Sequence, residues 1–211
     1  TFKLNSLLRA YGYQLITHLH QIGLRVFADL KLIDIPKTMK TDARFLADFQ
    51  PELLTVMTDA EIVGMRGVQE ILPDTEVLGV TVLTSLNDVQ CRRLHGAPVD
   101  ILVPTRMDLI HEAGLRGMVC AASDIKSALI AEARDYHLSI NTPGIRPAWA
   151  PIKNDDQART MTVAAALRAG AEMLPALSEK LSANGLPMPK TASPTRTEWE
   201  LANATGVSRF A

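Results

Sequence analysis

The sequence has 211 residues, 47% of them hydrophobic, and a formal net charge of -1. This length suits one soluble globular domain, and the small net charge gives no electrostatic reason to expect nucleic-acid or membrane partners. No apolar run approaches the roughly 20 residues that cross a bilayer, and the N-terminus lacks the apolar core of a secretory signal. Two cysteines are too few for a disulfide framework. We therefore expect a cytoplasmic protein.

Short apolar runs alternate with helical patterns along most of the chain. The predicted strands are 26–33, 53–58, 76–84, 116–121 and 137–142, and the predicted helices include 7–22, 124–136 and 162–174. Continuous apolar strands separated by helices are typical of βαβ units and a parallel sheet. This pattern leaves two folds open, an eight-fold barrel and an open doubly wound sheet. No GxGxxG or P-loop pattern follows a strand, which weakens the second.

The character of the sequence changes near residue 174. Residues 175–211 contain the proline-rich segment LPMPKTASP, which is unfavourable for a buried strand. We therefore predict a domain over residues 1–174. Residues 175–211 form C-terminal helices or a tail that completes or flanks it.

The densest group of charged residues lies at the end of the first predicted strand. Asp29 and Lys31 are two residues apart, Asp34 follows, and Pro36 ends regular pairing. Strand alternation places Asp29 and Lys31 on one face, and active sites of parallel α/β proteins lie at the carboxyl ends of strands. An internal ion pair without catalytic function explains the spacing equally well.

Four segments then match one family in order. They are VFADLKLIDIPKT at 26–38, VTVLTS at 80–85, GMVC at 117–120, and NTPGIRP at 141–147 with DDQAR at 155–159. The chain resembles the orotidine 5′-monophosphate decarboxylases over residues 3–174. The resemblance implies a (β/α)8 TIM barrel and a lyase of pyrimidine biosynthesis that converts orotidine 5′-monophosphate to UMP and CO2. It also implies a homodimer that uses no cofactor and no metal.

The resemblance assigns a role to each matching residue. Lys31 is the lysine that protonates C6 of the pyrimidine, and Asp29 faces the substrate carboxylate. Asp34 reaches across a dimer interface into the neighbouring site. Lys3 is the first lysine of the catalytic array, by its position before the first helix. The substrate-binding residues are Thr38, Thr84, Pro143 and Gly144, with Arg146 and Gln157 along the phosphate side.

The sequence also departs from the family pattern. The family has a strand with a ribose-binding aspartate before Lys3, and a final phosphate-gripping loop after residue 174. Ala121, Met57 and Lys37 replace the family's serine, histidine and asparagine. We therefore expect a barrel that is incomplete at the N-terminal strand and the final phosphate loop. Three explanations stay open: the sequence omits segments, the gene is shortened and diverged, or other segments replace these strands.

Two alternative functions remain. Related sugar-phosphate decarboxylases share the D-x-K-x-x-D array but add a magnesium site, so loss of activity in EDTA would indicate them. The second alternative is a non-catalytic or diverged paralogue on the same barrel. It predicts weak or absent UMP binding despite an intact Lys31.

Overall fold

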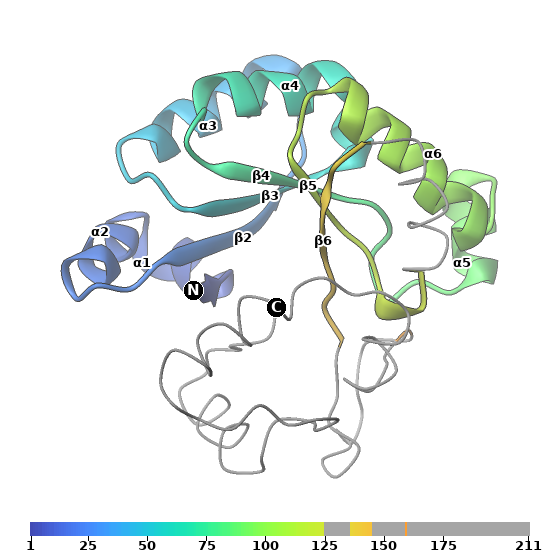
Figure 1. The fold of residues 1–211 in the computed structure, drawn as a ribbon, viewed down its shortest axis with the longest axis horizontal. Coiled ribbons are helices and arrows are strands. Elements are labelled where there is room, and N and C mark those ends of the chain that lie inside the picture. Colours follow the sequence, from blue (N-terminus) through green and yellow to red (C-terminus); the bar gives the residue numbers. More distant parts are fainter. Residues whose placement is uncertain (125–135, 145–158, 160–211) are drawn as a thin grey trace, which may run out of the picture.

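A computed structural model of the chain describes residues 1–124, 136–144 and 159. Within these residues six strands form one sheet in the order β1-β2-β3-β4-β5-β6, and every neighbouring pair is parallel (Figure 1). The strands are β1 Phe2–Leu4, β2 Val26–Leu32, β3 Leu53–Met57, β4 Glu76–Val80, β5 Gly117–Val119 and β6 Ser139–Asn141.

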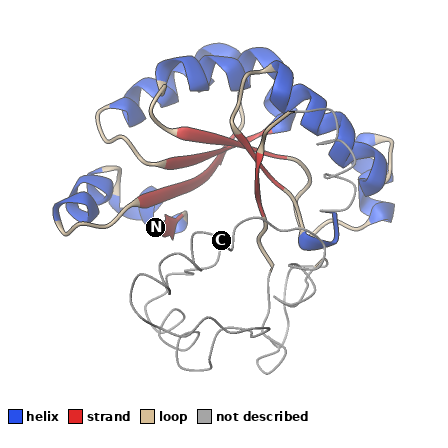
Figure 2. Cartoon of the chain, viewed as in Figure 1, coloured by secondary structure: helices blue, strands red, loops and turns tan. Residues whose placement is uncertain are grey.

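Helices connect the strands from β1 to β5 and lie along the outer side of the curved sheet (Figure 2). They are α1 Ser6–Tyr11, α2 Gln14–Gln21, α3 Pro36–Ala47, α4 Glu61–Ile71, α5 Asp88–His95 and α6 Val99–Glu112. Two short 3-10 turns follow strand ends, η1 Thr58–Ala60 after β3 and η2 Ala122–Asp124 after β5.

The strand order decides between the two folds that the sequence left open. A doubly wound sheet reverses its strand order at a switch point, whereas a (β/α)8 barrel keeps its strands in chain order. The sequential parallel order therefore confirms the predicted barrel fold. The predicted helix 162–174 and the segment 175–211 lie outside the described residues, as does most of the predicted helix 124–136.

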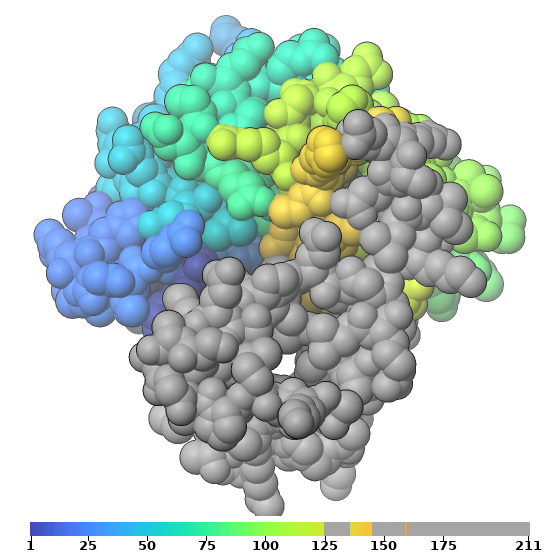
Figure 3. Space-filling model, viewed as in Figure 1, coloured from blue at the N-terminus to red at the C-terminus, as the bar shows by residue number. Residues whose placement is uncertain are grey.

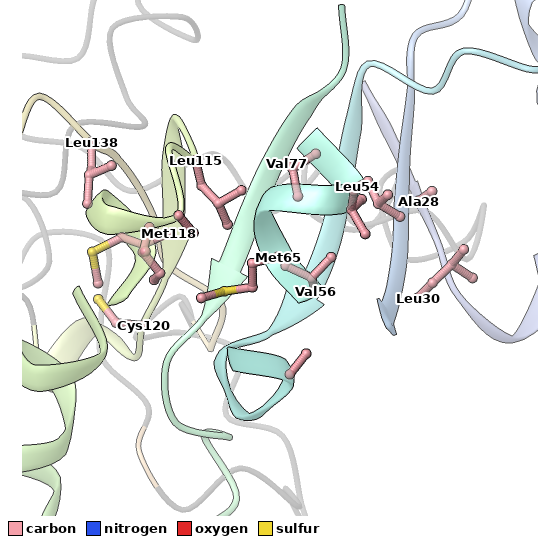
Figure 4. Close-up of a cluster of buried hydrophobic side chains, with 14 of the residues drawn as sticks. Ala28, Leu30, Leu54, Val56, Met65, Val77, Leu115, Met118, Cys120 and Leu138 are labelled. Carbon is pink, nitrogen blue, oxygen red and sulfur yellow. The ribbon is translucent and has the colours of Figure 1, made fainter. Parts of the chain in front are cut away.

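The hydrophobic core fills the space between the sheet and its covering helices. Leu54 and Val56 of β3 are fully buried and lie near Met65 of α4 (Figure 4). Successive strand residues point to opposite faces, so Thr55 points away from this helix layer. The core extends to Met118 of β5 and to Leu138, the residue just before β6. On the inner face, Thr55 lies beside its register partner Leu78 of β4, which is fully buried, so this face carries both polar and apolar side chains.

All five predicted strands are shorter in the structure, and two predicted elements differ most from the observed bounds. The predicted helix 7–22 is broken into α1 and α2, because Gly12 ends α1 with φ 80 and its N–H bonds to Leu8 O. The predicted strand 76–84 ends at Val80. Beyond it, the Thr81 hydroxyl donates to Val119 O, and the chain turns at Leu83, whose carbonyl accepts from Leu86 N. Strand β1 was not among the predicted strands.

The elements pack in succession around the molecule. The space-filling view shows the N-terminal segment in blue, the α3–α4 region in cyan to green, and β6 in yellow (Figure 3). None of the helices in the described part of the chain is both long and apolar enough to cross a bilayer.

The contact between β4 and α6 gives a test of the packing. A Cβ built at Gly79 lies 2.4 Å from Ile110 Cγ1 and 2.5 Å from its Cδ1, and Ile110 is fully buried. We expect Gly79→Ala to lower the free energy of unfolding by about 1–3 kcal/mol, measured by urea denaturation, because overpacking forces the helix away from the strand. Ile110→Ala removes both Cγ1 and Cδ1, so the cost of Gly79→Ala should be smaller in that background. An equal cost in both backgrounds would contradict this contact.

Candidate active site at the end of strand β2

Strand β2 is irregular where its charged residues lie. Ala28 pairs with Leu54 of β3, and the next paired residue, Leu32, faces Val56. Three residues, Asp29 to Lys31, therefore lie opposite the single residue Thr55, which is a β-bulge. Lys31 has φ 50, a left-handed conformation that is uncommon for a residue with a side chain. Bulges of this kind redirect side chains and are frequent beside active sites.

The bulge brings three polar side chains to one carboxylate. Asp29 is only 5% exposed. Its Oδ2 lies 3.2 Å from Lys3 Nζ, and its Oδ1 lies 2.6 Å from Lys31 Nζ. The Thr55 hydroxyl donates to the same Oδ1 at 2.9 Å. Strands β1, β2 and β3 each contribute to this network, which we call the Asp29 cluster (Lys3, Asp29, Lys31 and Thr55).

Thr55 has a second bond in the cluster. Its Oγ1 accepts the backbone N–H of Lys31 at 2.9 Å. Sequence reasoning missed this residue, although a signal exists: Thr55 is the one polar residue in the strand LLTVM. β-branched threonine is common in strands for packing reasons alone, so the signal is weak without the structure.

The electrostatics of the cluster favour an ionised Asp29. Burial alone raises the pKa of this carboxyl. The charge of Lys3, the hydrogen bond and charge of Lys31, and the hydrogen bond from Thr55 oppose burial. Together they hold the pKa of Asp29 below its ordinary value. The cluster is therefore a negative charge with two ammonium groups at hydrogen-bonding distance, in a largely desolvated position.

The sequence is similar to known proteins over most of its length. The model of the family described as "Orotidine 5'-phosphate decarboxylase / HUMPS family" matches residues 5–175. The chain belongs to this family.

Two curated relatives show the extent of the match. The orotidine 5'-phosphate decarboxylase of Thermosynechococcus vestitus is 34% identical over 169 residues, which cover 78% of this chain and 70% of the relative. The enzyme of the same name from Caulobacter sp. is 38% identical over 170 residues, covering 80% and 72%.

A solved structure supports the fold. The orotidine 5'-phosphate decarboxylase of Lactobacillus acidophilus aligns with a TM-score of 0.64 at 24% identity, covering 80% of this chain and 74% of that one. At this identity the likeness shows the fold alone. The predicted family and the predicted fold are both confirmed.

Asp34 and Thr38, two further residues assigned from the family resemblance, lie beyond the bulge. Asp34 is exposed, and its Oδ1 accepts the Ile35 N–H at 2.7 Å. Among the described residues, no ion pair joins Asp34 to Lys3 or Lys31 of the same chain. Thr38 is half-buried in the first turn of α3, which Pro36 begins. The structure thus gathers Lys3, Asp29 and Lys31 and leaves Asp34 apart from them.

Two arginines hold the segment that carries Thr84, which follows β4. Arg106, a buried residue of α6, donates to Thr81 O and lies 2.6 Å from the Asp59 carboxylate. Arg159 donates to Leu83 O at 3.0 Å and forms an ion pair with Asp124. The backbone N–H of Arg159 also bonds to Thr84 O at 3.2 Å. Neither arginine was predicted as a site residue.

The other assigned residues lie at or beyond the end of β6. Pro143 is half-buried, and Gly144 is buried with φ 80, a conformation that favours glycine. Arg146 and Gln157 lie outside the described residues. Among the residues that are described, no three His, Cys, Asp or Glu side chains are grouped as metal ligands.

The lowered pKa of Asp29 predicts a pH-dependent contribution to stability. A depressed carboxyl pKa stabilises the fold above the unfolded-state value, and this stability is lost as pH falls through the folded-state value. We expect Asp29→Asn to be less stable than the wild type by about 1–3 kcal/mol at pH 7. The difference should shrink as the pH falls below about 4. Urea denaturation of both proteins at several pH values measures it, and a difference that does not change with pH would contradict the prediction.

Proposed function

We propose that the protein decarboxylates orotidine 5′-monophosphate to UMP and CO2 in pyrimidine biosynthesis, without a metal or organic cofactor. The observation that carries the proposal is the Asp29 cluster at the carboxyl end of a barrel strand. In (β/α)8 enzymes the catalytic groups lie at this end. Membership of the family and curated relatives named orotidine 5'-phosphate decarboxylase supply the substrate.

The reaction places one demand on the site. The bond between C6 of the pyrimidine and the carboxylate carbon breaks, CO2 leaves, and the electron pair stays at C6. That pair lies in the ring plane and does not delocalise into the π system, so the barrier is intrinsically large. Preorganised positive charge beside C6 stabilises the developing carbanion without any reorganisation during the reaction.

Lys31 meets this demand in the proposal. Its ammonium provides the positive field, and it transfers a proton to C6 as general acid before regaining one from solvent. Asp29 fixes the ammonium, with Nζ and Oδ1 2.6 Å apart. Asp29 also faces the substrate carboxylate, and repulsion between the two raises the ground state relative to the transition state. Lys3 Nζ lies near the other oxygen of Asp29, Oδ2, so that the negative carboxylate lies between two positive lysines.

The proposal includes a cytoplasmic homodimer in which Asp34 acts in the neighbouring site. Two exposed isoleucines flank Asp34: Ile33 is 56% exposed and Ile35 is 66% exposed. Adjacent exposed apolar side chains favour burial against a partner. A pocket of about 430 Å³, lined by Leu30 to Ile33 together with Tyr13 and Asp42, lies beside them. These features support an interface at the end of β2.

The remaining residues bind the nucleotide in this proposal. Thr38 and Thr84 contact the ligand near the reacting ring, with Pro143 and Gly144 beside it. Arg146 and Gln157 lie along the phosphate side. Binding energy from the phosphate, remote from C6, contributes to stabilising the transition state.

Replacing Lys31 tests the chemical role. We expect Lys31→Ala to lower kcat by at least about 1,000-fold, because both the proton donor and the positive field are lost. The assay follows loss of the substrate's ultraviolet absorbance in EDTA without added metal. Lys40→Ala is the matched control, because Lys40 lies on α3 and pairs with Glu70 at 3.9 Å.

Three outcomes would overturn parts of this proposal. Wild-type turnover retained in Lys31→Ala would exclude the assigned mechanism. Activity abolished by EDTA would indicate a metal-dependent sugar-phosphate decarboxylase instead. No turnover by a folded wild-type protein would indicate a non-catalytic paralogue.

Complementation tests the role of Asp34 across the interface. We expect Lys31→Ala and Asp34→Asn to be inactive separately. Co-expressed at equal levels, they should recover about a quarter of wild-type activity, because half of the dimers are mixed and each mixed dimer has one intact site. If Asp34 acts in its own chain's site, every site of a mixed dimer carries one substitution, and no activity returns.

A further inference from the structure

Thr55 differs from the other members of the Asp29 cluster because its hydroxyl oxygen bonds both to the Asp29 carboxylate and to the backbone of Lys31. Its O–H donates to Asp29 Oδ1 at 2.9 Å, and the same oxygen accepts from Lys31 N at 2.9 Å. The side chain is 1% exposed, so water does not compete for either bond. A hydroxyl is the one small group that provides a donor and an acceptor from a single atom.

We infer that Thr55 is a positioning residue for the proposed decarboxylation, whose hydroxyl sets the orientation of the Asp29 carboxylate and the backbone of Lys31 together. The inference rests on the proposed function for its catalytic consequence. It assigns no chemical step to Thr55, which acts through its two neighbours.

The backbone geometry explains why this position needs support. Lys31 adopts φ 50 inside the bulge, a conformation unfavourable for a residue with a Cβ. Because the bulge interrupts the pairing of β2 with β3, no strand partner faces Lys31. The Thr55 hydroxyl takes the place of that partner for the Lys31 N–H. Without the Thr55 hydroxyl, the partly buried Lys31 N–H would lose this acceptor, and regular pairing of β2 with β3 would become more favourable.

The side-chain geometry gives the second reason. Lys31 Nζ and the Thr55 hydroxyl share Oδ1 of Asp29, while Lys3 Nζ lies on Oδ2. The Thr55 bond therefore restricts rotation of the carboxylate, so that each oxygen faces one lysine. Catalytic groups require this kind of support, since a displacement of about 1 Å can cost about 100-fold in rate.

Other buried threonines show what an ordinary structural role looks like. The hydroxyls of Thr58, Thr75 and Thr81 each donate to a backbone carbonyl. Thr55 differs because its hydroxyl donates to an ionised side chain. Thr75 is the matched control: it is equally buried, and its hydroxyl bonds to Pro51 O at 2.7 Å, at the amino ends of β3 and β4.

The first experiment compares kcat and KM of four proteins: wild type, Thr55→Val, Thr55→Ser and Thr75→Val. We expect Thr55→Val, which keeps the shape and removes the hydroxyl, to lower kcat by about 100-fold while KM changes little. Thr55→Ser should restore kcat to within a few-fold of wild type. Thr75→Val should lose stability but keep kcat. If Thr55→Val does not fold, Thr55→Ala replaces it.

The second experiment does not depend on turnover. The Asp29 carboxyl carbon is followed by NMR in a pH titration of wild type and Thr55→Val. Loss of the Thr55 bond should raise the pKa of Asp29, because that bond is one of the interactions that lower it.

The outcomes separate the two proposals. A folded Thr55→Val with wild-type kcat, or an inactive Thr55→Ser, would overturn the inference while leaving the decarboxylase intact. An unchanged Asp29 titration would also overturn it. A wild-type protein without turnover would overturn the proposed function, and the titration would still decide whether Thr55 holds Asp29.

Discussion

The burial of one ionised carboxylate between two lysines is the constraint on which the site depends. Asp29 is almost inaccessible to water, yet the charges and hydrogen bonds around it keep its pKa below the ordinary value. An isolated carboxylate in such a position would become neutral. The positive charges of Lys3 and Lys31 keep Asp29 ionised. In return, Asp29 holds both ammonium groups in positions that a reacting carbon can approach. The interactions that stabilise the buried charge of Asp29 therefore also fix the two lysines in place before the substrate binds.

The fold provides this arrangement from three consecutive strands. Parallel strands in chain order bring Lys3 of β1, Asp29 and Lys31 of β2, and Thr55 of β3 to one face. The opposite face is packed by apolar residues against the helices. The bulge in β2 is the local departure that makes the cluster possible, and its left-handed Lys31 is a strained conformation at a functional position. At the next strand end, Arg106 and Arg159 hold the segment that carries Thr84.

Periodicity predicted most of the fold, because continuous apolar strands alternate with helices over the described chain. It missed β1, because the charged Lys3 interrupts the short apolar run Phe2–Leu4, and it predicted one helix where α1 and α2 are separated at Gly12. For the site, alternation placed Asp29 and Lys31 on one face, and the two do meet. They meet through a bulge, however, which no spacing rule predicts. Lys3 was assigned by resemblance alone. Thr55 was missed because a threonine in a strand is ordinary until its partners are known.

If orotidine 5′-monophosphate reacts at the Asp29 cluster, a crystal structure with the product UMP should show the pyrimidine ring over the carboxyl end of β2, with C6 facing Lys31 Nζ. Asp34 of a second chain should lie within reach of the same ring. UMP bound elsewhere, or bound at this end with C6 turned away from Lys31, would show that the reaction does not take place at this cluster.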